Sequence, residues 1–120
     1  IETNNWLKKS TEIEDKLNIR NPLIITSKGN LDRQKLSLKY KPESIFCDIK
    51  PDPTFESCKK AINFIDISKF DGVVAIGGGS VMDTAKVAMA YIGTGINDIK
   101  KLLKIKSPRS FRIEAFKIHE

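Results

Sequence analysis

The sequence predicts an α/β domain built on a mainly parallel β-sheet with helices on both faces. Two observations lead to this prediction. Apolar runs of strand length alternate along the 120 residues with longer stretches of helical period, and the segments between strand candidates are long enough to hold a helix. A chain of this length is expected to form one domain, so we assign residues 1–120 to a single unit.

The amino-terminal part is predicted to be a helix followed by a buried strand. Asn5 can cap the helix, which should end before Asn21-Pro22 because proline cannot continue it. Its apolar face comprises Trp6, Leu7, Ile13 and Leu17. The run Leu23-Ile24-Ile25-Thr26 is continuous and largely β-branched, which is typical of a strand buried on both faces.

The middle of the chain is predicted to hold a short helix at 31–38, a second strand at 44–49 and a loop at Pro51-Asp52-Pro53, where proline blocks ladder pairing. Thr54 is a plausible N-cap for the amphipathic helix that follows. Its apolar positions, Phe55, Cys58, Ile62 and Ile65, recur at helical spacing.

The third strand, residues 72–76, is the most hydrophobic and runs directly into Gly77-Gly78-Gly79-Ser80. The next helix, at about 80–92, is apolar nearly all round, which predicts burial on most sides. Gly93 to Gly95 should end it. Residues 111–118 alternate apolar and polar positions, as a strand does.

The composition argues against several classes of protein. Lys plus Arg number 21 against 15 Asp plus Glu, a net charge of +6, and no run approaches the ~18–20 apolar residues of a membrane span. The first twenty residues do not resemble a signal peptide. Cys47 and Cys58 have no Cys or His at ligand spacing, so we expect reduced thiols in a cytoplasmic protein. Both ends look cut, and we expect a fragment of a longer protein.

The turn after the third strand is the main candidate for chemistry. Consecutive glycines can bring backbone N–H groups close to an anion, and the following helix adds the positive end of its dipole. The spacing differs from the usual dinucleotide fingerprint, because Met82 stands where a third glycine belongs, and no Gly-Lys-Ser or Gly-Lys-Thr of a Walker loop follows. A tight structural turn is the alternative.

Three polar residues follow this turn. Ser80 and Asp83 have the spacing of a capping box, which would satisfy N–H groups of the first helical turn without any ligand. Alternatively the Ser80 hydroxyl binds phosphate while Asp83 holds the loop. Lys86 either pairs with Asp83 at i, i+3 or reaches toward the site.

The run from Val73 to Lys86, VVAIGGGSVMDTAK, closely resembles the nucleotide-binding signature of the iron-containing (group III) alcohol dehydrogenases, within the dehydroquinate synthase-like superfamily. Residues 21–29, NPLIITSKG, resemble the first cofactor strand and turn of that family, and Pro51-Asp52-Pro53-Thr54 resembles its Pro-Asn-Pro-Thr loop. The resemblance weakens before Asn21 and after Ile99.

The resemblance implies a Rossmann-like domain that holds NAD or NADP, with the pyrophosphate on Gly78, Gly79 and Ser80. The other cofactor candidates are Gly77, Asp83, Thr26, Ser27, Lys28 and Asp52. The catalytic iron or zinc would belong to a helical carboxyl-terminal domain outside this chain, so no catalytic or metal-binding residue is assigned, and His119 is expected on the surface. The implied substrate is a small alcohol or aldehyde, with no membrane partner, and a homo-oligomer is left open.

Two positions depart from the family pattern. Asp52 replaces the usual Asn, which puts that contact with the cofactor in doubt, and Ser27 stands where NAD-preferring members often carry Asp. A serine followed by Lys28 suits a ribose 2′-phosphate, so we predict that NADP(H) is used at least as well as NAD(H).

The alternative function is a non-catalytic nucleotide- or nucleic-acid-binding module. Its basis is a basic stretch without acids: Lys100, Lys101, Lys104, Lys106, Arg109 and Arg112. No aromatic residues alternate with these cations to stack on bases, so nucleic acid is not expected as a partner. A receiver-like domain with Asp48 as phosphoacceptor fails, because no acidic pair ends the first strand.

Overall fold

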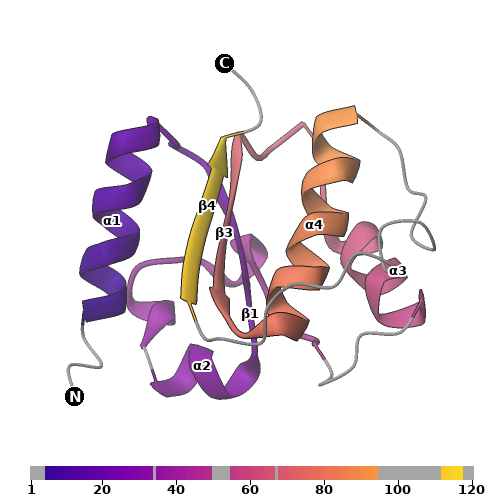
Figure 1. Ribbon diagram of the computed structural model, residues 1–120, viewed down its shortest axis with the longest axis horizontal. Helices are drawn as coiled ribbons and strands as arrows, with labels where there is room; N and C mark the ends of the chain where they lie inside the picture. Colours follow the sequence, from indigo (N-terminus) through magenta and orange to yellow (C-terminus); the bar gives the residue numbers. More distant parts are fainter. Residues whose placement is uncertain (1–4, 34, 50–54, 67, 95–111, 118–120) are drawn as a thin grey trace.

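A computed structural model describes residues 5–33, 35–49, 55–66, 68–94 and 112–117. The strands are β1 (Pro22–Thr26), β2 (Ile45–Phe46), β3 (Gly72–Gly77) and β4 (Arg112–Lys117). They form one sheet in the order β2-β1-β3-β4 (Figure 1). β1 is parallel to both β2 and β3, and β4 is antiparallel to β3. The prediction of an α/β domain with a mainly parallel sheet is confirmed.

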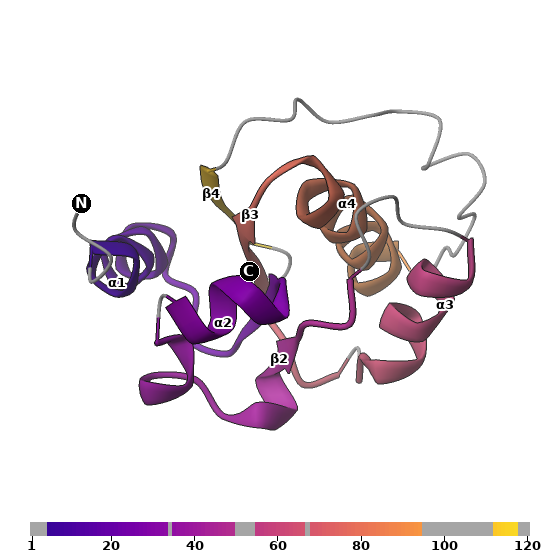
Figure 2. The same cartoon turned by 90° about the horizontal axis from the view of Figure 1, so that it is seen from below.

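Helices cover both faces of this sheet, as predicted. α1 (Asn5–Leu17) and α2 (Lys28–Arg33) lie on one side, and α3 (Phe55–Phe64) and α4 (Gly79–Thr94) lie on the other (Figure 2). Two short 3-10 helices, Leu36–Leu38 and Pro42–Ser44, connect α2 to β2. The arrangement is Rossmann-like. No described helix is long and apolar enough to cross a membrane.

The core divides into two layers because successive strand residues point to opposite faces. Leu23 and Ile25 of β1 pack with β3 residues against α3 and α4, whereas Ile24 packs on the other face with Leu36 and Tyr40. These strand residues have no exposed surface. Burying a side chain of this size contributes about 1.5–3 kcal/mol, so both central strands are fixed in the middle of the domain.

Two predicted elements differ from the structure. The second strand was expected at 44–49, but only Ile45 and Phe46 pair with β1. Pro42 starts a 3-10 turn in which the Ser44 N–H bonds to Lys41, so the strand cannot begin earlier. The short helix was expected at 31–38, but α2 begins at Lys28 and a separate 3-10 turn covers the last three positions.

The break between α2 and that 3-10 turn lies at Lys35, which adopts a left-handed backbone conformation with φ of 51°. This conformation is unfavourable for a non-glycine residue, and a right-handed α-helix cannot continue across it. The other helices and strands match the predicted ones to within a few residues. The predicted loop at residues 51–54, the basic residues 100–109 and His119 lie outside the described residues.

Candidate functional site

The glycine turn lies at the point where the strand order reverses. The chain leaves β1 toward β2 on one side and returns to β3 on the other side of β1. In open parallel α/β sheets, the carboxyl ends of two such strands flank a crevice in which ligands bind. Thr26 ends β1 and Gly77 ends β3, and α2 and the start of α4 lie at the same end of the sheet (Figure 1).

Gly77 is the residue at which the chain leaves the sheet. Its φ is +154°, in a region that L side chains rarely adopt. A Cβ atom on Gly77 would lie 2.6 Å from Cγ2 of Val81 and 3.2 Å from Nδ2 of Asn30. Gly77 is therefore required both by its backbone conformation and by the close approach of the first turn of α4.

The first main-chain bond of α4 runs from the Met82 N–H to the Gly78 oxygen, 3.0 Å apart. Gly78 is thus the N-cap, and the amide groups of Gly79 and Val81 precede the first main-chain donor of the helix. The amino terminus of α4, a helix of 16 residues, also carries the partial positive charge of the helix dipole. The turn can therefore receive an anion.

The capping-box interpretation is wrong in its placement. It required Ser80 at the N-cap, but α4 begins at Gly79, so Ser80 is the second residue of the helix.

Asp83 is only 3% exposed. Burial raises the pKa of the Cys58 thiol on α3, and the charge of Asp83 raises it further. The Asp83 carboxylate therefore lies close to α3. Lys86 is half-buried one turn later.

The residues predicted after β1 have mainly structural bonds. The buried Thr26 hydroxyl donates to the Ile76 carbonyl at 2.8 Å and so joins the ends of β1 and β3. The Ser27 hydroxyl accepts the Asn30 N–H at 3.2 Å, and the Ser27 carbonyl accepts the Leu31 N–H, so Ser27 caps α2. Lys28 is exposed at the start of that helix.

Asn30 was not predicted from the sequence to support the turn. This residue is 5% exposed, and its amide nitrogen donates to the Ile76 carbonyl at 3.4 Å. Its Oδ1 accepts a bond from the Arg33 guanidinium at 2.5 Å. Asn30 thus ties α2 to the residue before the glycine turn. The sequence offered one signal for this role: Asn30 is a polar residue three positions after Ser27, the residue that caps α2.

Gly77, Gly78, Gly79 and Ser80 lie together in one turn, and Thr26, Ser27 and Lys28 lie at the end of the neighbouring strand. Asp52 is outside the described residues. The described residues contain no group of three or more His, Cys, Asp or Glu side chains that could hold a metal ion. Iron or zinc therefore does not fit this part of the chain on its own.

The comparisons with known proteins agree with the earlier resemblance. The profile of the family described as iron-containing alcohol dehydrogenase matches residues 2–115. A probable mitochondrial hydroxyacid-oxoacid transhydrogenase of Dictyostelium discoideum is 48% identical over 58 residues, which are 48% of this chain and 10% of that protein. The mitochondrial hydroxyacid-oxoacid transhydrogenase of Caenorhabditis elegans is 37% identical over 84 residues, 70% of this chain and 17% of that protein.

A bacterial relative is also similar. Long-chain-alcohol dehydrogenase 1 of Geobacillus thermodenitrificans is 35% identical over 72 residues, 58% of this chain and 18% of that protein. The matches thus span less than a fifth of each of these relatives. No solved structure matches the chain. The expected cytoplasmic location is contradicted by these comparisons, because the similar transhydrogenases, including the human one, are mitochondrial proteins.

Proposed function

This chain belongs to the iron-containing alcohol dehydrogenase family of oxidoreductases, and we propose that it is the cofactor-binding part of a metal-dependent, NAD(P)-linked dehydrogenase. The observation that carries this proposal is the glycine turn at the reversal of strand order. There α4 begins at the carboxyl ends of β1 and β3, where sheets of this kind bind their ligands, and the tight contact between Gly77 and Val81 fixes the position of its first turn. A dinucleotide pyrophosphate is the anion that suits such a turn.

The chain residues have distinct proposed roles. Gly78, Gly79 and Ser80 hold the pyrophosphate through the turn and the dipole of α4. Ser27 and Lys28 lie at the end of β1, where the adenosine ribose would be expected. The bound dinucleotide supplies a hydride acceptor or donor, and this part of the chain binds and orients it.

Two cofactor candidates are assigned indirect roles. Thr26 keeps the ends of β1 and β3 together, because its hydroxyl already donates to Ile76. Asp83 is a positioning residue in the α3–α4 layer, since it is buried near Cys58.

The metal and the substrate belong to the proposal for the whole protein. The substrate is proposed to be a small alcohol or aldehyde, and the names of the similar transhydrogenases add hydroxyacid and oxoacid pairs as a second candidate class. The chain by itself is proposed to bind the dinucleotide without turning it over. Metal-dependent nicotinamide reduction by the purified 120 residues would contradict this.

The experiment is a calorimetric titration of the purified chain with NAD(H) and NADP(H). Gly79→Val places a branched side chain in the turn and should weaken binding at least about tenfold, the equivalent of one charge-assisted hydrogen bond. Ala90→Val is the matched control, because it puts the same side chain into the same helix about three turns away.

A melting curve for each variant separates loss of binding from loss of folding. The proposal requires Gly79→Val to lose affinity while it keeps a melting temperature close to that of Ala90→Val. Equal affinity in both variants would mean that the turn is only structural, and failure of the wild type to bind either dinucleotide would contradict the proposed function.

A further inference from the structure

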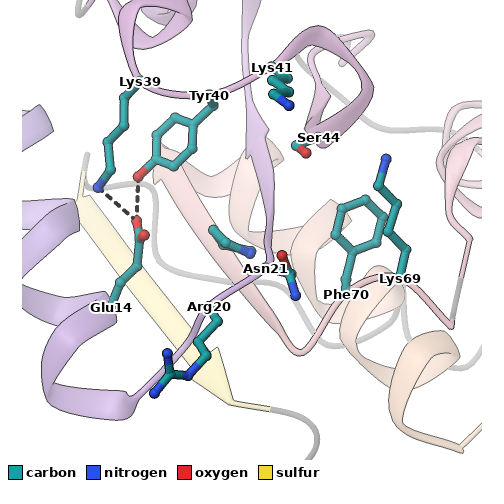
Figure 3. A pocket seen from close by; sticks show the side chains of 10 residues that line it. Glu14, Arg20, Asn21, Lys39, Tyr40, Lys41, Ser44, Lys69 and Phe70 are labelled. Carbon is teal, nitrogen blue, oxygen red and sulfur yellow. Dashed lines mark hydrogen bonds and ion pairs between the residues drawn. The ribbon is translucent and has the colours of Figure 1, made fainter.

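A second hollow lies at the opposite end of the sheet, next to the amino ends of β1 and β3. It has a volume of about 260 Å³, and its lining includes Pro22, the first residue of β1. Phe70, two residues before β3, also lines it (Figure 3). The six residues of β3, at about 3.3 Å each, place it roughly 20 Å from the glycine turn. A ligand here would be separate from the proposed dinucleotide.

Cationic side chains dominate the lining. Arg20, Lys39, Lys41 and Lys69 contribute four positive charges, and Glu14 contributes the one negative charge. Lys39 forms an ion pair with Glu14 at 3.2 Å. Among the described residues, no ion pair occupies the other three cations, which leaves this surface with an excess of positive charge. In Figure 3, Arg20 points away from the other side chains, while Lys41 and Lys69 extend on the side where Ser44 lies.

Two carboxylates next to the hollow, those of Glu14 and Asp71, are already held by donors of the protein. Glu14, 8% exposed, accepts hydrogen bonds from both Lys39 and the Tyr40 hydroxyl (Figure 3). Asp71 accepts the backbone N–H groups of Arg20 and Asn21, at 2.9 and 2.8 Å. These bonds fix the walls of the hollow and turn both acids toward protein donors.

The remaining lining combines rigid and polar groups. The rings of Tyr40 and Phe70 are almost fully buried, so they form fixed walls, and Asn21 and Ser44 offer an amide and a hydroxyl. The Lys69 ammonium lies 5.6 Å from the centre of the Phe70 ring. This cation–π contact orients the ammonium group. The exposed Asp66 carboxylate interacts electrostatically with Lys69, but the described ion pairs do not include these two residues, and Asp66 accepts the N–H and the hydroxyl of Ser68.

We propose that this hollow binds a small dianion, of the phosphate or dicarboxylate type, between Lys41 and Lys69. Its volume lies just below the roughly 300–1,000 Å³ of pockets for drug-sized ligands, so it suits a molecule much smaller than a dinucleotide. Two cations without ion pairs among the described residues, with a hydroxyl and an amide in the same lining, match the charge and the acceptors of such an anion.

The test uses the purified chain, titrated separately with inorganic phosphate and with succinate at low ionic strength, and follows the backbone amides by NMR. We expect saturable shifts around Asn21, Ser44 and Phe70. The stronger of the two probes assigns the site to the phosphate or to the dicarboxylate type. Lys41→Ala and Lys69→Ala should each weaken binding about tenfold, as for the loss of one charge-assisted hydrogen bond.

Lys8→Ala is the matched control, because it removes the same charge from an exposed position of α1 outside the hollow. Its binding should equal that of the wild type. Shifts confined to the amides of residues 77–81 would place the anion at the glycine turn instead, and an equal loss in Lys8→Ala would mean a general effect of net charge. Either result, or an absence of saturable shifts, would overturn the proposal.

Discussion

Replacing Gly77 with alanine should destabilise the domain more than any other single methyl added to the glycine turn. The substitution forces an L residue to adopt φ of +154°, a conformation that costs about 1–3 kcal/mol. It also places Cβ 2.6 Å from Cγ2 of Val81, well inside contact distance, and overpacking of this kind costs about 1–3 kcal/mol. The free energy of unfolding should therefore fall by roughly 2–6 kcal/mol, the sum of the two costs.

This loss is large compared with the roughly 5–15 kcal/mol that stabilises a typical domain. At about 4 °C per kcal/mol for a chain of this size, the melting temperature should drop by roughly 8–24 °C. Urea unfolding followed by circular dichroism gives the free energy, and calorimetry gives the melting temperature. Gly79→Ala is the control, because among the described glycines the positive φ belongs to Gly77 and not to Gly79. Gly79→Ala should change the free energy of unfolding by less than about 1 kcal/mol.

A double variant separates the two causes. Val81→Ala removes Cγ2, the atom that the new Cβ would strike. The double variant Gly77→Ala/Val81→Ala should therefore lose less unfolding free energy than the two single variants lose together, by about 1 kcal/mol or more. The part due to backbone strain should remain. A Gly77→Ala protein within about 0.5 kcal/mol of the wild type would refute the reasoning, and additive losses would refute the clash.

Three further predictions concern the cofactor and two buried groups. Ser27→Asp should shift the ratio of dissociation constants toward NAD(H), because a carboxylate accepts from the ribose 2′-hydroxyl and repels a 2′-phosphate; a wild type strongly selective for NAD(H) would contradict this. Burial, and after it the hydrogen bond to Glu14, raises the pKa of the Tyr40 hydroxyl. Above about pH 10 the unfolded state therefore loses this proton while the folded state keeps it, so the free energy of unfolding falls as the pH rises. Tyr40→Phe should cost about 1–2 kcal/mol at pH 7 and flatten that fall in urea unfolding at pH 8–11; an unchanged slope would count against it. Iodoacetamide at pH 8 should label half-buried Cys47 well before Cys58, whose pKa burial raises, and equal rates in mass spectrometry would contradict this.

The central strands could be predicted from the sequence because burial leaves a continuous pattern. Leu23 to Ile25 and Val73 to Ile76 have no exposed surface, so every position in them must be apolar. The edge strand β2 could not be delimited in the same way. Its length is set by the 3-10 turn that precedes it and by the end of β1, its pairing partner, and neither limit is written in the apolar residues of 44–49.

The glycine turn was also found from the sequence, whereas its supports were not. Thr26 was predicted to face the cofactor, but its hydroxyl donates to a carbonyl 50 residues away. Asn30 reaches the same carbonyl from α2. Such bonds depend on the register of β1 against β3, which pairs Thr26 with Ile76. A pattern of residue types along the chain carries no information on which distant carbonyl a hydroxyl will meet.

These supports bear on how the turn could bind an anion. The Ile76 carbonyl accepts hydrogen bonds from both Thr26 and Asn30, and the Val81 side chain lies directly against Gly77. The start of α4 is therefore held by contacts within the protein. An anion that docks on a turn of fixed shape pays little for ordering it, and most of the electrostatic attraction then appears as affinity. If the turn binds an anion as proposed, Thr26 and Asn30 would influence that binding through the geometry of the glycines, because the Thr26 hydroxyl and the Asn30 amide nitrogen both donate to the Ile76 carbonyl.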